Sequence, residues 1–336
     1  MLVSARTESI ELFLERAGWS HARRVPLAGD ASFRRYERVS QGAQHAVLMD
    51  APPPHEDVRP FIKIASHLRA LGYSAPDIYA EDAELGALLL EDLGDDLFTR
   101  VLDAIGDESL LYRHAVDLLV DLAQRELPDE VPTYDILALL EEASLFIDWY
   151  LPALSGHPMH STEREAFLDA WRRALPLADE GSPVLVLRDF HVDNLVWLDR
   201  PDPISRVGLL DFQDAVIGPR MYDLVSLLED ARRDISPVLV AEMFERYVTA
   251  TRMDGASAAA AYAVLGAQRN TKIIGIFTRL CQRDGKSDYL KYIPRVWKLL
   301  EHDLEHPALG PVRDWFAQCV PDSMRDSAIT NAVAAL

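Results

Sequence analysis

The sequence predicts an α+β fold with two lobes, a small antiparallel β-sheet lobe followed by a larger helical lobe. Short apolar runs near the N-terminus, separated by polar turns, have the length and composition of strands. From Glu108 onward, apolar residues instead recur at steps of three and four, which is typical of helices. With 336 residues, 49% of them hydrophobic, the chain is long enough to bury a core in each lobe.

The first lobe is expected to span residues 1–92 and the second residues 93–336. In the first lobe, apolar periodicity and alternation predict helices over 9–18 and 56–71 and strands over 24–27, 33–39, 44–49 and 87–90. The last of these strands ends in the turn Glu91 to Gly94, where we place the boundary. In the second lobe the helical pattern predicts helices over 110–125, 135–150 and 163–175, and the alanine-rich stretch 256–263 is good helix-forming material.

Two acidic clusters follow apolar runs that read as strands, residues 184–187 and 207–210. The first cluster contains Asp189 and Asn194, and the second contains Asp211. Phosphoryl transfer requires oxygen ligands for Mg²⁺ and a carboxylate that orients or deprotonates the attacking hydroxyl. Asp189 suits the base, Asn194 and Asp211 suit the metal, and the five-residue step from Asp189 to Asn194 is the spacing of a kinase catalytic loop. The pair of clusters predicts an enzyme that uses ATP and Mg²⁺.

These segments resemble the aminoglycoside phosphotransferase family of small-molecule kinases, which have a catalytic loop of the form HGDxHxxN. The matching stretches are residues 189–194, residues 210–215, Gly218-Pro219 and residues 222–224, while Leu187 and Arg188 stand in the first two places of the loop pattern. The resemblance implies a bilobal protein-kinase-like fold. It also implies that residues 1–92 bind the nucleotide and residues 93–336 carry catalysis and acceptor binding.

Within that family the chain is most similar to sugar kinases that phosphorylate N-acetylmuramate and N-acetylglucosamine at the anomeric hydroxyl. The supporting strings are residues 30–36, 49–53, 189–194 and 211–215. This resemblance implies a sugar α-1-phosphate as the product, in peptidoglycan recycling. Two alternatives stay open: a kinase of another acceptor, such as an aminoglycoside, choline or homoserine, and a catalytically silent kinase-like binding protein.

The nucleotide site departs from the kinase pattern at one place. The third strand of a kinase carries a lysine that contacts the phosphates, and Met49 stands there instead. Arg34, Arg35 or Lys63 can supply the missing charge, and we favour an arginine. The turn before the second strand offers backbone N–H groups and a hydroxyl to phosphates, and the turn after residue 90 corresponds to the segment that holds adenine in related kinases. The expected ATP-binding residues are Ser32, Phe33, Arg34, Arg35, Met49, Glu91 and Leu93.

Residues 262–286 bear on the acceptor because they carry several cations in an otherwise acidic chain. Arg269, Lys272, Arg279 and Arg283 recur at helical spacing and are expected on one side of a helix, where they suit a carboxylate and repel a polycationic acceptor. A solvated helix face is the alternative. The candidate acceptor-binding residues are His191, Gln213, Asp214, Arg232, Lys272 and Arg279. For His191 and Asp193 an organising role in the loop is equally open, and Asp214 is favoured as a turn residue. Asp223 is expected either to favour a helix dipole as an N-terminal charge or to brace the loop.

Net charge and cysteine content limit the partners and the cellular location that we expect. The net charge of −20, from 34 basic and 54 acidic side chains, argues against a nucleic-acid partner. Cys281 and Cys319 match no metal or redox spacing and are expected to be reduced thiols. The sequence shows neither a signal peptide nor an apolar run long enough to span a membrane. We therefore expect a soluble, cytoplasmic monomer whose partners are ATP and a small amino sugar.

Overall fold

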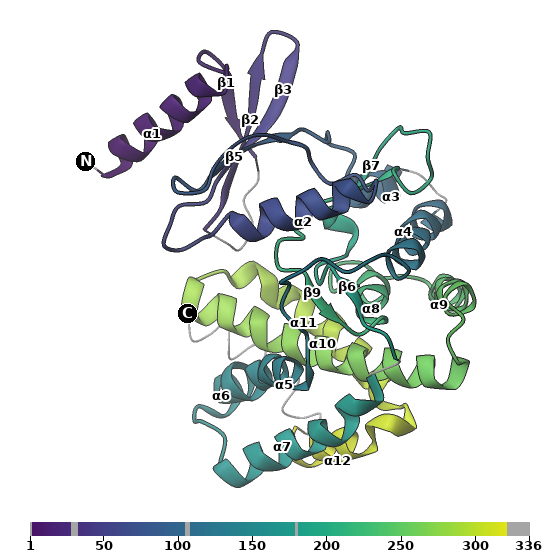
Figure 1. Ribbon diagram of the computed structural model, residues 1–336. Coiled ribbons are helices and arrows are strands. Elements are labelled where there is room, and N and C mark those ends of the chain that lie inside the picture. The colour runs from purple at the N-terminus through teal and green to yellow at the C-terminus, as the bar shows by residue number, and fades with distance from the viewer. Residues whose placement is uncertain (1, 28–32, 105–107, 179–180, 321–336) are drawn as a thin grey trace. The chain divides into compact units, whose positions relative to one another are not determined.

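The computed structural model describes residues 2–27, 33–104, 108–178 and 181–320, and the chain divides into two compact units. Unit 1 comprises residues 1–115 and 192–214, and unit 2 comprises residues 116–191 and 215–336 (Figure 1). One helix, α4 (Glu108–Leu122), contains the division between residues 115 and 116. The expected lobes 1–92 and 93–336 stay a prediction.

Unit 1 contains two antiparallel sheets and several helices. Its elements are α1 (Leu2–Arg16), β1 (Arg23–Pro26), β2 (Arg35–Gln41), β3 (Gln44–Asp50), α2 (Arg59–Ala70), β4 (Ile78–Asp82), β5 (Ala87–Glu91), α3 (Phe98–Ala104), the 3₁₀ turn η3 (Val192–Asn194), β7 (Leu195–Trp197) and β8 (Val207–Leu209). The larger sheet has the order β1-β2-β3-β5-β4 with every pair antiparallel. This confirms the antiparallel sheet expected from the sequence.

The strand β4 was not expected, and its position explains why. It lies at the edge of the sheet, and its residues alternate between half-buried and exposed. An edge strand of this kind lacks the continuous apolar run that marks a central strand. The central strand β5, in contrast, is buried along Ala87 to Leu90 and was recognisable from its sequence.

The core of unit 1 lies between α1 and one face of the large sheet. Ile10, Phe13 and Leu14 of the helix pack in one cluster with alternate residues of β2, β3 and β5. Alternation is required because successive side chains of a strand point to opposite faces. The other face therefore receives the intervening residues, among them Met49 and Leu88, which are also fully buried.

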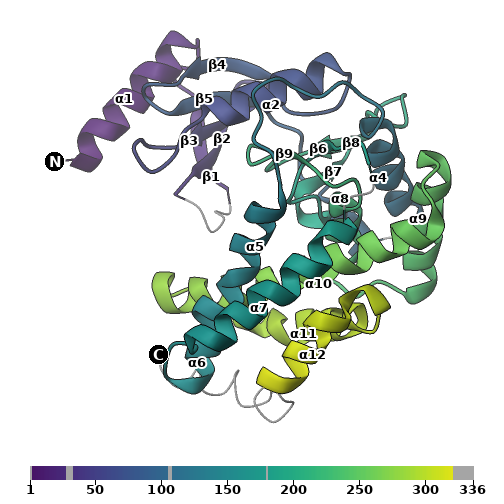
Figure 2. The same cartoon turned by 60° about the horizontal axis from the view of Figure 1, so that its bottom comes forward.

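Unit 2 is mostly helical. Its elements are α5 (Ile136–Leu145), the π-helical turn η1 (Phe146–Tyr150), α6 (Leu151–Ser155), α7 (Ser161–Ala174), η2 (Leu175–Ala178), β6 (Val184–Val186), β9 (Val216–Gly218), α8 (Tyr222–Leu228), α9 (Pro237–Thr251), α10 (Gly255–Asp284), η4 (Ser287–Tyr292), α11 (Ile293–Leu304), η5 (Pro307–Leu309) and α12 (Gly310–Cys319). β6 and β9 form a short antiparallel pair. The long helix α10 packs against α5, η1, α8 and α11 (Figure 2). Within the described part of the chain, no helix combines the length and apolar character needed to cross a membrane.

The contact between α10 and the end of α5 depends on a glycine. A Cβ atom added at Gly275 would lie 2.4 Å from the carbonyl carbon of Leu145 and 2.6 Å from the backbone nitrogen of Phe146. Real Cβ atoms do not approach backbone this closely, so any side chain at residue 275 would push the two helices apart. Gly255, at the first turn of the same helix, has open space around it.

We predict that Gly275→Ala destabilises the protein by about 1–3 kcal/mol, as expected for overpacking of a close backbone contact. The matched control is Gly255→Ala, which should leave stability unchanged or raise it by up to about 1 kcal/mol because alanine favours helix. Urea denaturation followed by circular dichroism measures both. Equal stabilities for the two variants would contradict the close packing of α10 on α5.

Candidate active site

A two-stranded hairpin in unit 1 places Asn194 and Asp211 at the same end. Asn194 immediately precedes β7, and Asp211 follows β8 by one residue beyond Leu210. The strands pair with Leu195 opposite Leu209, and the Leu210 N–H donates to the carbonyl oxygen of Asn194 at 3.0 Å. The backbones of Asn194 and Asp211, the two residues expected to hold metal, therefore lie next to each other across the strand pair.

The turn that carries Asn194 is held in place by its neighbours. The Thr99 hydroxyl of α3 donates to the carboxylate of Asp193, and Val196 of β7 bridges to Leu97. Asp193 thus organises the loop, one of the two roles left open by the sequence.

Asp211 lies at a special point of the backbone, with a φ of 57° in the left-handed region. The next residue, Phe212, is buried and stacks on Phe61 of α2 with ring centroids 4.9 Å apart. The Gln213 amide donates to Asp211 Oδ1 at 2.9 Å and to Asp214 Oδ2 at 3.2 Å. A phenylalanine anchored in the core thus fixes the orientation of the carboxylate that precedes it.

The oxygen atoms around Asp211 suit a divalent cation. Gln213 Oε1 is buried and has no hydrogen-bond partner among the described residues, which leaves a carbonyl oxygen available beside the Asp211 carboxylate. Mg²⁺ prefers such oxygen ligands and takes others from phosphate and water. In the described part of the chain no group of three or more His, Cys, Asp or Glu is arranged to hold a metal alone. The Asp211 carboxylate and the Gln213 carbonyl oxygen thus fit a divalent cation that takes its other ligands from outside these two residues.

Arg34 is the arginine that contacts this cluster. Its Nη2 lies 3.4 Å from Asp211 Oδ1, and its Nε lies 3.8 Å from Glu56 Oε2. Burial opposes its charge, but Tyr36 and Asp211 hold the pKa of Arg34 above its ordinary value. The sequence pattern predicts Glu56 only as the start of a helix and does not indicate its ion pair with Arg34.

The sheet register shows which residues lie beside Met49. Tyr36 is paired with Met49 across β2 and β3, so their side chains share one face of the sheet. Arg34 immediately precedes β2 and reaches Asp211, whereas Arg35 is paired with Asp50 and is exposed. Lys63 lies on α2.

Phe33 adjoins the same cluster. Its ring is exposed and stacks on His55, and its N–H donates to Glu56 Oε1 at 3.0 Å. Glu56 therefore holds both the backbone of residue 33 and the side chain of residue 34. The neighbouring Ser32, expected to face the phosphates, lies outside the described residues.

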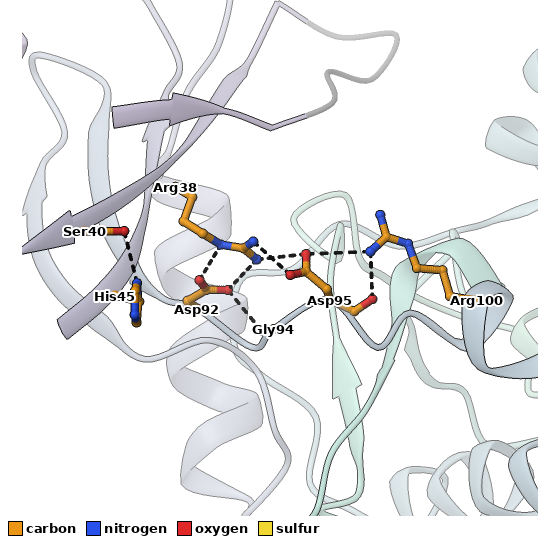
Figure 3. Close-up of polar contacts among 7 residues, drawn as sticks. All are labelled: Arg38, Ser40, His45, Asp92, Gly94, Asp95 and Arg100. Atoms are coloured by element: carbon orange, nitrogen blue, oxygen red, sulfur yellow. Dashed lines mark hydrogen bonds and ion pairs between the residues drawn. The ribbon is translucent and has the colours of Figure 1, made fainter. Parts of the chain in front are cut away.

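The segment that follows β5 is braced from the sheet by Arg38. The Arg38 guanidinium donates to both carboxylate oxygens of Asp92, at 2.6 and 3.1 Å, and to both of Asp95, at 2.9 and 3.0 Å (Figure 3). Asp92 also accepts from the Gly94 N–H, and Arg100 donates to the carbonyl of Asp95. This network fixes the turn that sequence analysis assigned to adenine binding.

Glu91 and Leu93, expected to contact the nucleotide through their backbone, have side chains that are used internally. Glu91 accepts from Arg200 at 2.9 Å and from the Asp77 N–H at 3.2 Å. The Leu93 side chain packs at Gly208 of β8, where a Cβ would lie 3.2 Å from it. The Glu91 N–H donates to the carbonyl of Asp77 at 2.7 Å, and backbone contacts of Glu91 and Leu93 with adenine stay predictions.

In unit 2, the loop residues that lead to Asp189 are held by α8. The Asp223 carboxylate accepts from the N–H groups of Leu187 and Arg188 at 2.6 and 2.9 Å, and the Ser226 hydroxyl donates to the carbonyl of Arg188 at 3.2 Å. Asp223 thus braces the loop, which confirms one of its two expected roles. Asp189 belongs to unit 2, and Asn194, five residues further along the sequence, to unit 1.

His191 is buried in unit 2, and its N–H donates to the carbonyl of Asp189 at 3.1 Å. Burial and the positive charge of Arg232 lower the pKa of the imidazole, against Asp230 and Asp189, which raise it. The ring is therefore neutral at neutral pH. A buried, neutral histidine in this turn supports the organising role.

Of the four cations expected on one side of α10, two are buried and Arg283 is exposed. Lys272 is buried, with its ammonium 3.1 Å from Glu142 and 2.6 Å from the Tyr222 hydroxyl, and Arg269 is buried beside the carbonyl of Glu229. The alternative of a solvated face is therefore wrong for both. Arg279 is half-buried, and Arg232 lies over the ring of Tyr292 at 6.0 Å. Acceptor contacts for Arg232, Lys272 and Arg279 stay predictions.

Several known proteins are similar to this chain in sequence or in fold. Residues 23–261 match the phosphotransferase enzyme family. The chain is 36% identical to an N-acetylmuramate/N-acetylglucosamine kinase of Caulobacter vibrioides, over 96% of this chain and 99% of that protein. It is 38% identical to the kinase of the same description from Pseudomonas aeruginosa, over 87% of each chain. The crystal structure of the choline kinase LicA from Streptococcus pneumoniae superposes with a TM-score of 0.64 at 14% identity, over 88% of this chain and 99% of that one, which confirms the expected fold.

The buried Asp223 predicts a pH dependence of stability. Burial raises the pKa of its carboxyl to about 7, although the Leu187 and Arg188 N–H groups oppose the rise. Because the pKa in the folded state exceeds that of the unfolded chain, this group stabilises the fold fully below about pH 4, and the contribution is lost as pH rises through about 7.

We therefore expect the stability difference between the wild type and Asp223→Asn to shrink, by an amount on the order of a few kcal/mol, between pH 4 and pH 8. Urea unfolding of both proteins across this range measures it. A difference that does not change with pH would show that Asp223 is ionised throughout.

Proposed function

We propose, from the premise that this chain belongs to the phosphotransferase enzyme family, that it is an ATP-dependent kinase of N-acetylmuramate and N-acetylglucosamine. The observation that carries the kinase assignment is the cluster of Asn194, Asp211, Gln213 and Arg34 at one end of the β7–β8 hairpin. The acceptor is supported by relatives 33–38% identical over most of the chain, each described as a kinase of these two sugars.

On the nucleotide side, Asn194 and Asp211 would hold Mg²⁺ together with phosphate oxygens. The bound ion neutralises the charge of the phosphates. Arg34 would bind the phosphates in place of the strand lysine, since it immediately precedes β2 and reaches Asp211. Its planar guanidinium offers two parallel donors where a lysine offers a single ammonium. Ser32 would offer its hydroxyl to the phosphates and Phe33 would lie beside them, with its own N–H held by Glu56. The carbonyl of Glu91 and the backbone of Leu93 would bind the adenine.

On the acceptor side, Asp189 would orient the sugar hydroxyl and accept its proton. The hydroxyl we propose is the anomeric one, so that the product is a sugar α-1-phosphate. Because the ring oxygen withdraws electron density, this hydroxyl is more acidic than an ordinary alcohol. A weak base such as a carboxylate is therefore sufficient to accept its proton. Most of the catalysis then comes from positioning and charge neutralisation.

The wider setting follows from the same acceptors. N-acetylmuramate is a component of peptidoglycan, so an enzyme that phosphorylates it would act in the recycling of cell-wall sugars. We propose that it does so in the cytoplasm, where ATP is present, and as a monomer.

The acceptor assignment is tested by incubating the purified full chain with Mg-ATP and, separately, N-acetylmuramate, N-acetylglucosamine, choline and an aminoglycoside. Phosphorus NMR locates the transferred phosphate. We expect a sugar 1-phosphate from both amino sugars and no transfer to the cationic acceptors. Asp189→Asn should lower turnover by about 100-fold or more while the protein still binds ATP. Phosphate on choline or the aminoglycoside alone would overturn the assignment, and so would unchanged turnover in Asp189→Asn.

Arg34 is tested separately from the acceptor. Arg34→Ala should raise the KM for ATP about tenfold or more and leave the KM for the sugar within about twofold, because a phosphate contact is lost. The matched control is Arg59→Ala on α2, whose exposed guanidinium pairs with Asp57 and Glu84. If Arg35→Ala rather than Arg34→Ala raises the KM for ATP, the assignment of Arg34 is wrong.

A further inference from the structure

The residue immediately before the proposed base has an unusual backbone. Arg188 has a φ of 69°, in the left-handed region that favours glycine. The family's catalytic-loop pattern has glycine at this place. An arginine here is conformationally strained, so its side chain must supply contacts that keep the turn in this form.

Those contacts come from Glu142 of α5 and from Tyr134, which precedes that helix, and both belong to unit 2. The Arg188 guanidinium forms an ion pair with Glu142 of α5 and lies over the ring of Tyr134 at 5.5 Å. Glu142 also pairs with Lys272 of α10 at 3.1 Å and accepts a hydrogen bond from the Tyr134 hydroxyl. Lys272 in turn donates to the Tyr222 hydroxyl of α8. The carboxylate of Glu142 is thus shared between two cations.

The same residue is also held through its backbone. Asp223 accepts from its N–H, and the Ser226 hydroxyl donates to its carbonyl. Arg188 is therefore fixed at its N–H, its carbonyl and its side chain. A glycine would keep the two backbone contacts and would lose the third, which leaves the turn free to rotate.

The charges around the loop also balance. Arg188 and Lys272 carry two positive charges and Glu142 one negative, so this group of three, the Arg188 triad, has a net charge of +1. Asp189 attracts both cations electrostatically. When Asp189 accepts a proton and becomes neutral, it no longer balances the positive charge of the triad.

We propose that Arg188, held by Glu142, is a positioning residue that fixes the carboxylate of Asp189 for proton acceptance and supplies the positive charge that remains once the proton is transferred. This inference rests on the proposed function of Asp189 as the base. It does not depend on which hydroxyl compound is the acceptor, because the Arg188 triad acts on the loop.

The test measures kcat, both KM values and the midpoint of thermal unfolding for Arg188→Gly, Arg188→Lys, Glu142→Gln and the double variant Arg188→Gly/Glu142→Gln. Arg188→Gly should fold, because glycine adopts the left-handed conformation freely, and should lower kcat about tenfold or more with the KM for ATP within about twofold. Arg188→Lys should recover part of this loss, since an ammonium can still pair with Glu142. The double variant should lose no more kcat than the worse single variant.

The matched control is Arg252→Gly. Arg252 also has a positive φ, 56°, and ends α9 in the same unit, where it has no part in the loop. Relief of strain there should leave kcat unchanged. Wild-type kcat in Arg188→Gly would overturn the proposal, as would losses that multiply in the double variant. A lowered unfolding midpoint with an unchanged kcat per active site would equally overturn it, because the role would then be structural.

All variants are measured with the acceptor that the wild type phosphorylates. Failure of the sugar assignment therefore shows in the wild type alone. Failure of the Arg188 assignment shows only in the ratio of variant to wild-type kcat, so the two are distinguishable.

Discussion

The pairing of β7 with β8 is the constraint on which the proposed nucleotide site depends. Because Leu195 lies opposite Leu209 and the Leu210 N–H donates to Asn194, the residues just before one strand and just after the other meet at one end of the hairpin. A slip of one residue would turn Asp211 away and would bury its carboxylate in place of Phe212. The stack of Phe212 on Phe61 opposes such a slip. The packing of Phe212 thus keeps Asn194 and Asp211 in register.

The loop of Asp189 in unit 2 is built on the same principle, with buried polar contacts in place of a strand pair. Asp223, Ser226 and Glu142 hold the residues before Asp189 from helices distant in sequence. Buried carboxylates are costly unless they accept hydrogen bonds or pair with cations, and both conditions are met here. The raised pKa of Asp223 is the consequence of that cost. Ionisation of Asp223 therefore lowers the stability of the fold, although its carboxylate accepts the two N–H groups that hold the loop.

The sequence was sufficient for features that are local. The central strands of the sheet and the spacing of Asp189, Asn194 and Asp211 follow from apolar runs and short motifs. The choice among Arg34, Arg35 and Lys63 was not local, because it depends on Arg34 reaching Asp211. The role of Glu142 was out of reach, since it lies 46 residues before its partner Arg188. For Lys272 the sequence left a solvated face open as the alternative to acceptor binding, because helical spacing shows which residues share a side and not whether that side is covered.

Binding of Mn²⁺ in place of Mg²⁺, followed by electron paramagnetic resonance with a non-hydrolysable ATP analogue, tests the central claim most directly. If the end of the β7–β8 hairpin is the metal–nucleotide site, the wild type binds Mn²⁺ tightly only with the nucleotide present. Asn194→Ala and Asp211→Asn should then each weaken that binding by about tenfold or more. Unchanged Mn²⁺ affinity in both variants would contradict the account, because the metal would then be held elsewhere.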